Sequence, residues 1–272
     1  MINKKNKIQS VIIVGIVLLI FSICVIQMNS NINTIIPTSI KNFDSKTMEW
    51  GIKRAKDHVQ PDLGNVNKKI LEENGGICVG NDFDKVIYLT FDSGYEAGYT
   101  DEILNILKQN NVKATFFITS HYLNSASNLV ERMIKEGHIV GNHTCNHISM
   151  PSISNEDIKE EMMKLHQAVY EKFNYEMKYI RPPKGNFNER TLKEIEELGY
   201  TTVMWSFAYC DWDEKKQPSV EDAKKIIIDN LHCGEIMLLH SNSKTNLEVL
   251  DSIIKEAQNQ GYEFKTLDEF KK

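Results

Sequence analysis

The sequence predicts an α/β domain built on a mostly parallel sheet, because two patterns recur from residue 86 onward. Short apolar runs rich in β-branched and aromatic residues alternate with longer amphipathic stretches. Serine followed three residues later by aspartate opens two of these stretches, and glycine follows three of them. Strands that alternate with helices are joined by crossover connections, which make neighbouring strands parallel. The alternation alone does not distinguish an open sheet from a barrel.

The expected elements follow one another in a regular order. Strands are expected at 86–91, 114–119, 138–141, 178–181, 200–206, 235–240 and 262–266. Helices are expected at 100–110, 128–136, 154–173, 188–198, 219–232 and 246–260. Ser154 and Ser219 are the expected N-caps of two helices, since Asp157 and Asp222 complete acidic variants of the capping box. The expected stop signals are Gly137, Gly199 and Gly261.

Length and charge limit the possible functions. A chain of 272 residues has room for one large domain and a tail. Its formal net charge of −5 and its pI near 5.9, without a basic stripe, argue against binding to nucleic acid.

The N-terminal segment differs in composition from the rest of the chain. Lys4, Lys5 and Lys7 precede an uncharged stretch, and a helix over 8–28 would be ~31 Å long at about 1.5 Å per residue, enough to cross a membrane. Lysines before a span keep that end cytoplasmic. We therefore expect a single-pass membrane protein with an extracytoplasmic domain, although a cleaved signal peptide is an alternative. The expected division is an anchor at 1–28, a linker and loop-rich lead-in at 29–85, and the main folded domain at 86–272.

Two segments contain residues typical of catalytic or metal sites. In VIYLTFDSGYE (86–96), an apolar strand ends in Asp92, and carboxylates at such strand ends are typical of catalytic positions in α/β folds. In GNHTCNH (141–147), the four-residue spacing of His143 and His147 would allow both imidazoles to bind one cation. Either signal is weak alone, and Asp92 could equally cap a helix.

Three later motifs make the pattern specific. They are RPPKGNF with Arg181, WSFAYCDW with Asp211, and EIMLLH with His240. With all five motifs in this order, the chain resembles the polysaccharide deacetylase family, whose shared unit is the NodB homology domain. The resemblance extends over about residues 86–267. It implies a distorted (β/α) barrel of about seven strands, with the active site at the C-terminal ends of the strands.

The resemblance also assigns roles to four residues in the hydrolysis of an acetamide. Asp92 matches the general base, and Arg181 matches the arginine that orients it and would lower its pKa. His240 matches the general acid that protonates the leaving nitrogen. Asp211 matches the carboxylate that tunes this histidine.

Metal and substrate positions are implied in the same way. His143 and His147 match two ligands of a divalent cation, of which zinc is the expected one. Ser93 stands where the family has a third, aspartate ligand, so it would be a poor ligand and the cation would bind weakly. The remaining matches are the Lys184 backbone N–H as oxyanion donor, and Trp212 and Leu238 as walls of the acetate pocket.

Further motifs resemble those of the spore-cortex peptidoglycan N-acetylmuramic acid deacetylases. These are GYE (94–96), WGIK (50–53), ATFFITSHY (114–122) and FKTLDEF (264–270). The implied reaction removes acetate from N-acetylmuramic acid and permits formation of muramic δ-lactam. The implied partners are peptidoglycan glycan strands and, functionally, an amidase that strips peptides. Two alternatives are a deacetylase of N-acetylglucosamine or chitin-like glycans, and a non-catalytic glycan-binding protein in which Ser93 marks lost catalysis.

Overall fold

The computed structural model describes residues 46–271, and all seven predicted strands are present in one sheet. The sheet has the order β7-β5-β4-β3-β2-β8, with β9 paired to β2, and every pair is parallel. Its strands are β2 (Val86–Ser93), β3 (Thr115–Ile118), β4 (Ile139–Asn142), β5 (Tyr179–Ile180), β7 (Thr201–Thr202), β8 (Glu235–His240) and β9 (Glu263–Phe264). The prediction of a parallel α/β fold is confirmed.

The sheet is curled but is not a closed barrel. Within residues 46–271, β7 and β8 form no ladder with each other, and a single bridge from Phe207 to Met237 spans the gap between them. The expected barrel is therefore corrected to a half-barrel. The two-residue strands β5 and β7 provide too few backbone hydrogen bonds to complete the ring.

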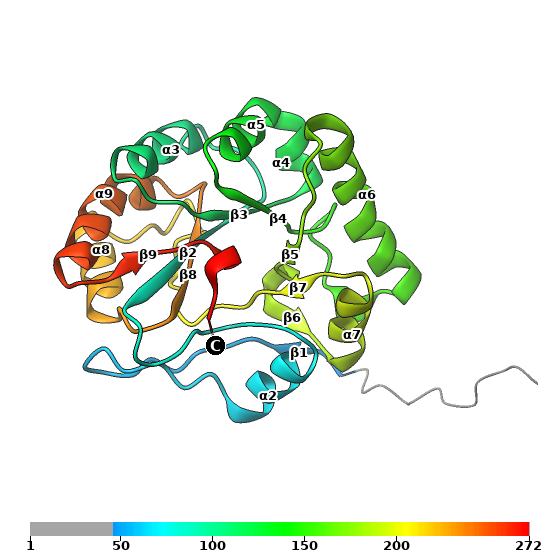
Figure 1. The fold of residues 1–272 in the computed structure, drawn as a ribbon, viewed down its shortest axis with the longest axis horizontal. Helices are drawn as coiled ribbons and strands as arrows, with labels where there is room; N and C mark the ends of the chain where they lie inside the picture. Colours follow the sequence, from blue (N-terminus) through cyan, green and yellow to red (C-terminus); the bar gives the residue numbers. More distant parts are fainter. Residues whose placement is uncertain (1–45, 272) are drawn as a thin grey trace, which may run out of the picture. The chain divides into compact units, whose positions relative to one another are not determined.

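Helices cover the outer side of the curled sheet (Figure 1). Six lie at the predicted positions: α3 (Thr100–Gln109), α5 (Ser127–Lys135), α6 (Asn155–Phe173), α7 (Glu189–Glu197), α8 (Val220–Asp229) and α9 (Lys244–Asn259). Ser154 and Ser219 cap their helices as predicted, because their hydroxyls accept the backbone N–H of Asp157 and Asp222. The three predicted stop glycines have φ angles of 80°, 81° and 84°, in the left-handed region.

Four short elements were not predicted from the sequence. They are β1 (Met48–Glu49), α2 (Asn65–Glu73), α4 (Ser120–Ser125) and β6 (Asn186–Phe187), and three 3₁₀ turns accompany them at Met150–Ser152, Pro183–Gly185 and Leu267–Glu269. β1 pairs antiparallel with β6. The Trp50 indole, buried with Leu71 and Phe187, donates a hydrogen bond to the Trp205 carbonyl over 2.8 Å. The lead-in from residue 46 therefore packs against the residues that follow β5 and β7.

Side chains along β2 alternate between the two faces of the sheet. Every second residue from Ile87 to Phe91 packs into the core beneath the outer helices. Tyr88 points to the opposite, inner face of the sheet. Asp92, four residues further along the strand, lies on the same inner face. Because Ser93 follows Asp92 within the same strand, its side chain turns toward the helix layer.

The expected membrane span lies at 8–28, outside the described residues. Across residues 46–271, every helix is too short or too polar to cross a lipid bilayer. The expected assignment as a single-pass membrane protein is corrected accordingly, since no helix within residues 46–271 could span a membrane.

Candidate active site

The predicted catalytic residues meet at the C-terminal ends of the parallel strands. The pairing of β2 with β8 places Asp92 directly opposite His240. The pairing of β4 with β5 brings together His143 and Arg181, the residues that follow these strands. A pocket of about 1040 Å³ opens at this end of the sheet. It is lined by Asp92, Gly94, Tyr95, Thr119, His121, His143, Cys145, Asn146, His147, Lys184, Gly185, Trp205, Ala208, Tyr209, Trp212, Leu238, His240 and Asn242.

Asp92 and Arg181 form a buried ion pair on the floor of the pocket. Arg181 Nη1 donates to Asp92 Oδ1 over 2.8 Å and to Thr90 Oγ1 over 2.9 Å. The Arg181 side chain is fully buried, and its guanidinium lies 4.4 Å from the centroid of the Phe117 ring. Burial raises the pKa of Asp92, but Arg181 opposes this effect and the net pKa is lowered. Asp92 is therefore an ionised carboxylate at neutral pH.

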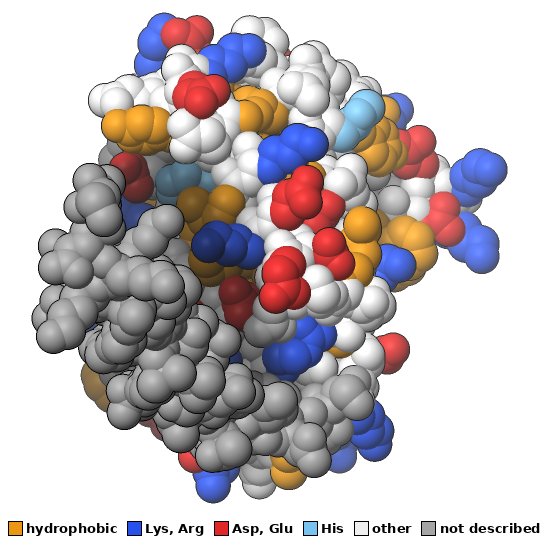
Figure 2. Space-filling model, turned by 90° about the vertical axis from the view of Figure 1, so that its right-hand side faces the viewer, with side chains coloured by type: hydrophobic (Ala, Val, Ile, Leu, Met, Phe, Trp, Pro, Cys, Tyr) orange, Lys and Arg blue, Asp and Glu red, His pale blue; other side chains and the backbone are white. Residues whose placement is uncertain are grey.

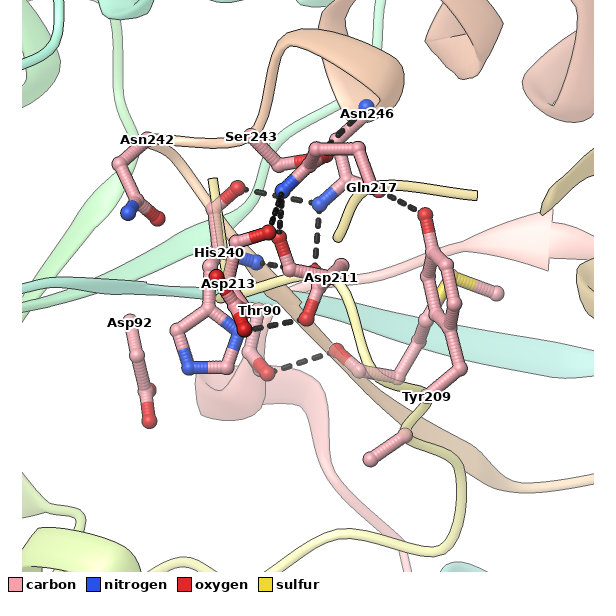
Figure 3. A network of polar contacts seen from close by, with 12 residues as sticks. Thr90, Asp92, Tyr209, Asp211, Asp213, Gln217, His240, Asn242, Ser243 and Asn246 are labelled. Atoms are coloured by element: carbon pink, nitrogen blue, oxygen red, sulfur yellow. Dashed lines mark hydrogen bonds and ion pairs between the residues drawn. The ribbon is translucent and has the colours of Figure 1, made fainter. Parts of the chain in front are cut away.

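His240 and Asp211 form the second charged pair. His240 Nδ1 donates to Asp211 Oδ1 over 2.8 Å, and the His240 backbone N–H donates to Asp211 Oδ2 over 2.8 Å. Burial lowers the pKa of His240, but the neighbouring Asp211 carboxylate outweighs it and the net pKa is raised. Figure 3 shows the His240 ring between Asp92 and Asp211. The pocket thus presents a carboxylate and an imidazole that readily holds a proton, the groups required of a base and an acid.

The two predicted metal histidines lie side by side. The ring centroids of His143 and His147 are 4.7 Å apart. His143 Nδ1 lies 2.8 Å from the Arg181 carbonyl, which can only accept, so His143 Nε2 carries the lone pair and lies 3.5 Å from Asp92 Oδ2. Burial lowers the pKa of His143. Although His147 reaches solvent, partial burial and His143 lower its pKa to about 4. Both imidazoles are neutral at pH 7.

Ser93 does not join these two histidines. Its hydroxyl is buried on the helix side of β2 and lies 2.8 Å from the Ser241 hydroxyl. The prediction of Ser93 as a weak ligand is corrected, because the alternation of the strand turns Ser93 away from the face that carries Asp92. Among residues 46–271, no three His, Cys, Asp or Glu side chains are arranged to hold a metal ion. The donors present therefore do not complete the three-ligand set that the resemblance implies.

The three predicted substrate-binding residues line the pocket. Lys184 adopts a left-handed conformation, with a φ of 61°, in the turn after Arg181. Gly185 follows it with a φ of 66°, and a Cβ there would lie 2.7 Å from the Trp205 ring, so this position requires glycine. Leu238 is 5% exposed and forms part of the wall, whereas Trp212 is 58% exposed at the rim.

Sequence reasoning missed several polar residues around the site. Thr90 was detectable, because it lies two residues before Asp92 and therefore on the same face of β2. Tyr95 contacts both Glu214 and Asn242, which belong to two different loops at the rim. Asn246 contacts Asp211 from the first turn of α9, and no local pattern in the sequence indicates this contact.

Comparisons with known proteins agree with this arrangement. A family model described as "Polysaccharide deacetylase" matches residues 80–203. The chain is 39% identical over 226 residues to the peptidoglycan-N-acetylmuramic acid deacetylase PdaA of Bacillus subtilis, covering 83% of this chain and 86% of that protein. It is 34% identical over 207 residues to a peptidoglycan-N-acetylglucosamine deacetylase of Bacillus cereus, covering 74% and 96%.

A solved structure supports the same assignment at the level of the fold. The structure of Bacillus subtilis PdaA, described as a family 4 carbohydrate esterase, superposes with a TM-score of 0.81 at 39% identity, over 83% of this chain and 97% of that one. The chain belongs to the polysaccharide deacetylase family and is a deacetylase of the hydrolase class.

Proposed function

We propose that this protein removes the acetyl group from N-acetylmuramic acid residues of peptidoglycan, releasing acetate and permitting muramic δ-lactam formation in the spore cortex. The observation that carries this choice of sugar is the position of Lys184. Among the described residues that line the pocket, Lys184 is the only lysine or arginine. A muramic residue without its peptide has a free lactyl carboxylate, which N-acetylglucosamine lacks. The likeness to PdaA supports the same substrate.

The proposed mechanism uses the two charged pairs of the pocket. Asp92 Oδ1 is occupied by Arg181, so Oδ2 is the oxygen that takes a proton from the attacking water. Addition of the water oxygen to the acetyl carbonyl gives a tetrahedral oxyanion, which the Lys184 backbone N–H would stabilise. His240 then donates a proton to the nitrogen, the carbon–nitrogen bond breaks, and acetate and a free amine leave. Return of the proton from Asp92 to His240 through solvent restores the site.

The chemistry of this substrate sets a requirement for an earlier reaction. A lactyl group still joined to its peptide is an amide without a negative charge, and it would leave the Lys184 ammonium unpaired. We therefore expect an amidase that strips the peptide to act before this protein. The partnership is one of reaction order and needs no physical contact.

A deacetylase of N-acetylglucosamine is the second candidate, because a relative 34% identical over 207 residues is named for that substrate. The same base and acid would serve it, so the two candidates differ only in the contact to the lactyl group. A non-catalytic glycan-binding protein is disfavoured, because the chain belongs to a deacetylase family and both charged pairs are assembled.

The test compares two glycans and two lysine variants. Acetate release is measured on peptide-stripped peptidoglycan strands and on N-acetylglucosamine oligomers. We expect Lys184→Met to raise KM for the muramic substrate by about 10–100-fold, since a hydrogen bond to a charged group contributes ~1.5–3 kcal/mol. The backbone N–H at position 184 remains in this variant, so kcat should change little.

Lys244→Met serves as the control, because Lys244 is exposed on α9 and its ion-pair partner within residues 46–271 is Glu248, outside the pocket. Faster acetate release from the glucosamine oligomers, unaffected by Lys184→Met, would assign the protein to the second candidate.

Mass analysis of cortex muropeptides from cells lacking the protein checks the proposal in vivo. We expect δ-lactam to disappear and free glucosamine to remain.

A further inference from the structure

Behind His240, on the side away from Asp92, lies a buried polar network that the proposed mechanism does not use (Figure 3). Asn246, in the first turn of α9, is fully buried. Its Nδ2 donates to Asp211 Oδ2 over 2.5 Å and to the His240 carbonyl over 3.0 Å. Tyr209, 9% exposed, donates its hydroxyl hydrogen to Asn246 Oδ1. One amide group therefore contacts both members of the proposed acid pair.

The hydrogen bonds of the Asp211 carboxylate show what this amide contributes. Oδ1 accepts from His240 Nδ1, while Oδ2 accepts from the His240 backbone N–H and from Asn246 Nδ2. The bond from His240 Nδ1 to Oδ1 depends on the rotation of the carboxylate. The two hydrogen bonds to Oδ2 fix that rotation. Because Asp211 is 1% exposed, water does not replace a lost donor readily.

The orientation of the amide is itself determined by its neighbours. Reversal of the Asn246 side chain would place its oxygen against Asp211 Oδ2, so that two acceptors would face each other in a buried site. The Tyr209 hydroxyl supports the observed orientation by donating to Asn246 Oδ1. The Asn246 backbone N–H is held by Ser243 Oγ over 3.1 Å, which fixes the start of α9 beside Asp211.

We propose that Asn246, oriented by Tyr209, is a positioning residue that locks the Asp211 carboxylate so that His240 keeps its proton on Nδ1 and directs Nε2 into the pocket. Asn246 does not line the pocket, so it acts through Asp211 rather than by contact with substrate. Tyr209 has one edge on the pocket and the other on the amide. The charged groups that face His240 are Asp211, Asp92 and Arg181. This role rests on the proposed function of His240 as general acid.

Two variants test the proposal on the full chain. Asn246→Leu removes the amide with little change in volume, and Tyr209→Phe removes only the hydroxyl that orients it. We expect kcat to fall by about 10–100-fold in Asn246→Leu and by a smaller factor in Tyr209→Phe, with KM within about twofold of the parent, as for other residues that orient a catalytic group. Asn246→Ser, which restores a donor, should recover part of the loss.

Matched controls separate positioning from general loss of stability. Asn110→Leu removes a similar amide, which donates to Asp251 over 2.9 Å between α3 and α9. Tyr175→Phe removes the hydroxyl that accepts the Val140 N–H over 3.1 Å. Both controls lie outside the pocket and should leave kcat unchanged even where they lower the melting temperature.

A spectroscopic measurement makes the inference independent of substrate. In protein labelled with ¹⁵N-histidine, the signals of His240 are assigned by their loss in His240→Ala. We expect the parent to show a single Nδ1–H form when neutral, and Asn246→Leu to show a mixture of the two tautomers. This result in a protein without deacetylase activity would refute the proposed function and leave the positioning role intact.

Three outcomes would overturn the inference. One is an unchanged kcat and ¹⁵N signature in folded Asn246→Leu and Tyr209→Phe. Another is a fall in melting temperature alone, which would make the network structural. The third is a raised KM at unchanged kcat in Asn246→Leu, which would mean that Asn246 contacts the substrate.

Discussion

Asp92 has two tasks in this protein, and they respond differently to substitution. It is the candidate base, and it is also the counter-ion of a guanidinium with no exposure to solvent. An unpaired buried charge costs far more than an exposed one, so the loss of the Asp92 charge affects the whole domain. His240 has no comparable structural task, because its partner Asp211 keeps a hydrogen bond from Asn246 when the imidazole is removed.

We therefore expect Asp92→Asn and His240→Ala to lose similar amounts of activity but different amounts of stability. Each should lower kcat by at least about a hundredfold, the contribution of a positioned acid or base. Asp92→Asn should also lose ~3–5 kcal/mol of unfolding free energy, because Arg181 is left without a charged partner. Urea unfolding measures the loss of stability, and initial rates on stripped glycan measure the loss of activity. The control is Asp251→Asn, which removes the charge from a surface ion pair with Lys255. Near-parent kcat in folded Asp92→Asn would refute its role as base.

Ser93 gives the opposite case, a residue with a role in packing and none in the pocket. We expect Ser93→Ala to leave zinc affinity within about twofold of the parent, while the loss of one buried hydrogen bond to Ser241 costs ~1 kcal/mol. His147→Ala should lower the affinity by about tenfold or more, since it removes one of two neutral imidazoles. Calorimetric titration with zinc decides between the two residues. A tenfold loss of affinity in Ser93→Ala would show that its hydroxyl turns into the pocket when metal binds.

At the scale of elements, the sequence predicted the positions of the strands because each is a short apolar run next to an amphipathic stretch. The apolar runs before Asp92 and His240 are long and bounded on both sides, and both became full strands. The run at 200–206 gave only the two-residue strand β7, because the chain beyond it forms isolated bridges instead of a ladder. Helix ends were predictable from Ser154 and Ser219, since capping is a local interaction.

Other features were beyond a local pattern. The order of strands depends on which apolar faces pack together, and the sequence does not encode that order within any short window. Helix α2 was predicted as loop because its glycine-rich surroundings dominate the segment, although Leu71 packs into a core with Trp50 from the lead-in. The contact of Asn246 with Asp211 links residues 35 positions apart through the position of a whole helix.

For the molecule as a whole, strand β8 connects two polar sites at opposite ends of the half-barrel. His240 lies at its C-terminal end in the pocket, and Glu235 lies at its other end, fully buried. Glu235 Oε2 accepts the His232 backbone N–H over 3.1 Å, whereas Oε1 is buried without a partner among the described residues. Burial raises the pKa of Glu235 well above its usual value and lowers that of His232 to about 4. Burial therefore favours the neutral form of both side chains, although His232 Nδ1 lies 3.5 Å from Glu235 Oε2.

A raised pKa in the folded state makes overall stability depend on pH in a predictable direction. The unfolded chain releases the Glu235 proton above its ordinary pKa, whereas the folded chain retains it. The contribution of this group to stability is therefore complete below that pKa and is lost as pH rises toward the folded value. Glu235→Gln is always neutral, and its amide can keep the bond to the His232 N–H. We expect the variant to match the parent near pH 4 and to become the more stable protein between pH 6 and 8.

Urea unfolding of the parent and of Glu235→Gln across this pH range gives the difference in their unfolding free energies. The contributions of all other titrating groups cancel in this difference. The exposed Glu263→Gln on β9 is the control, because surface substitutions of this kind change stability by less than about 0.5 kcal/mol at any pH. Parallel curves for the parent and Glu235→Gln would mean that Glu235 is ionised in the folded protein. In that case Glu235 and His232 would form a true buried ion pair, and substitution of either residue alone should cost several kcal/mol.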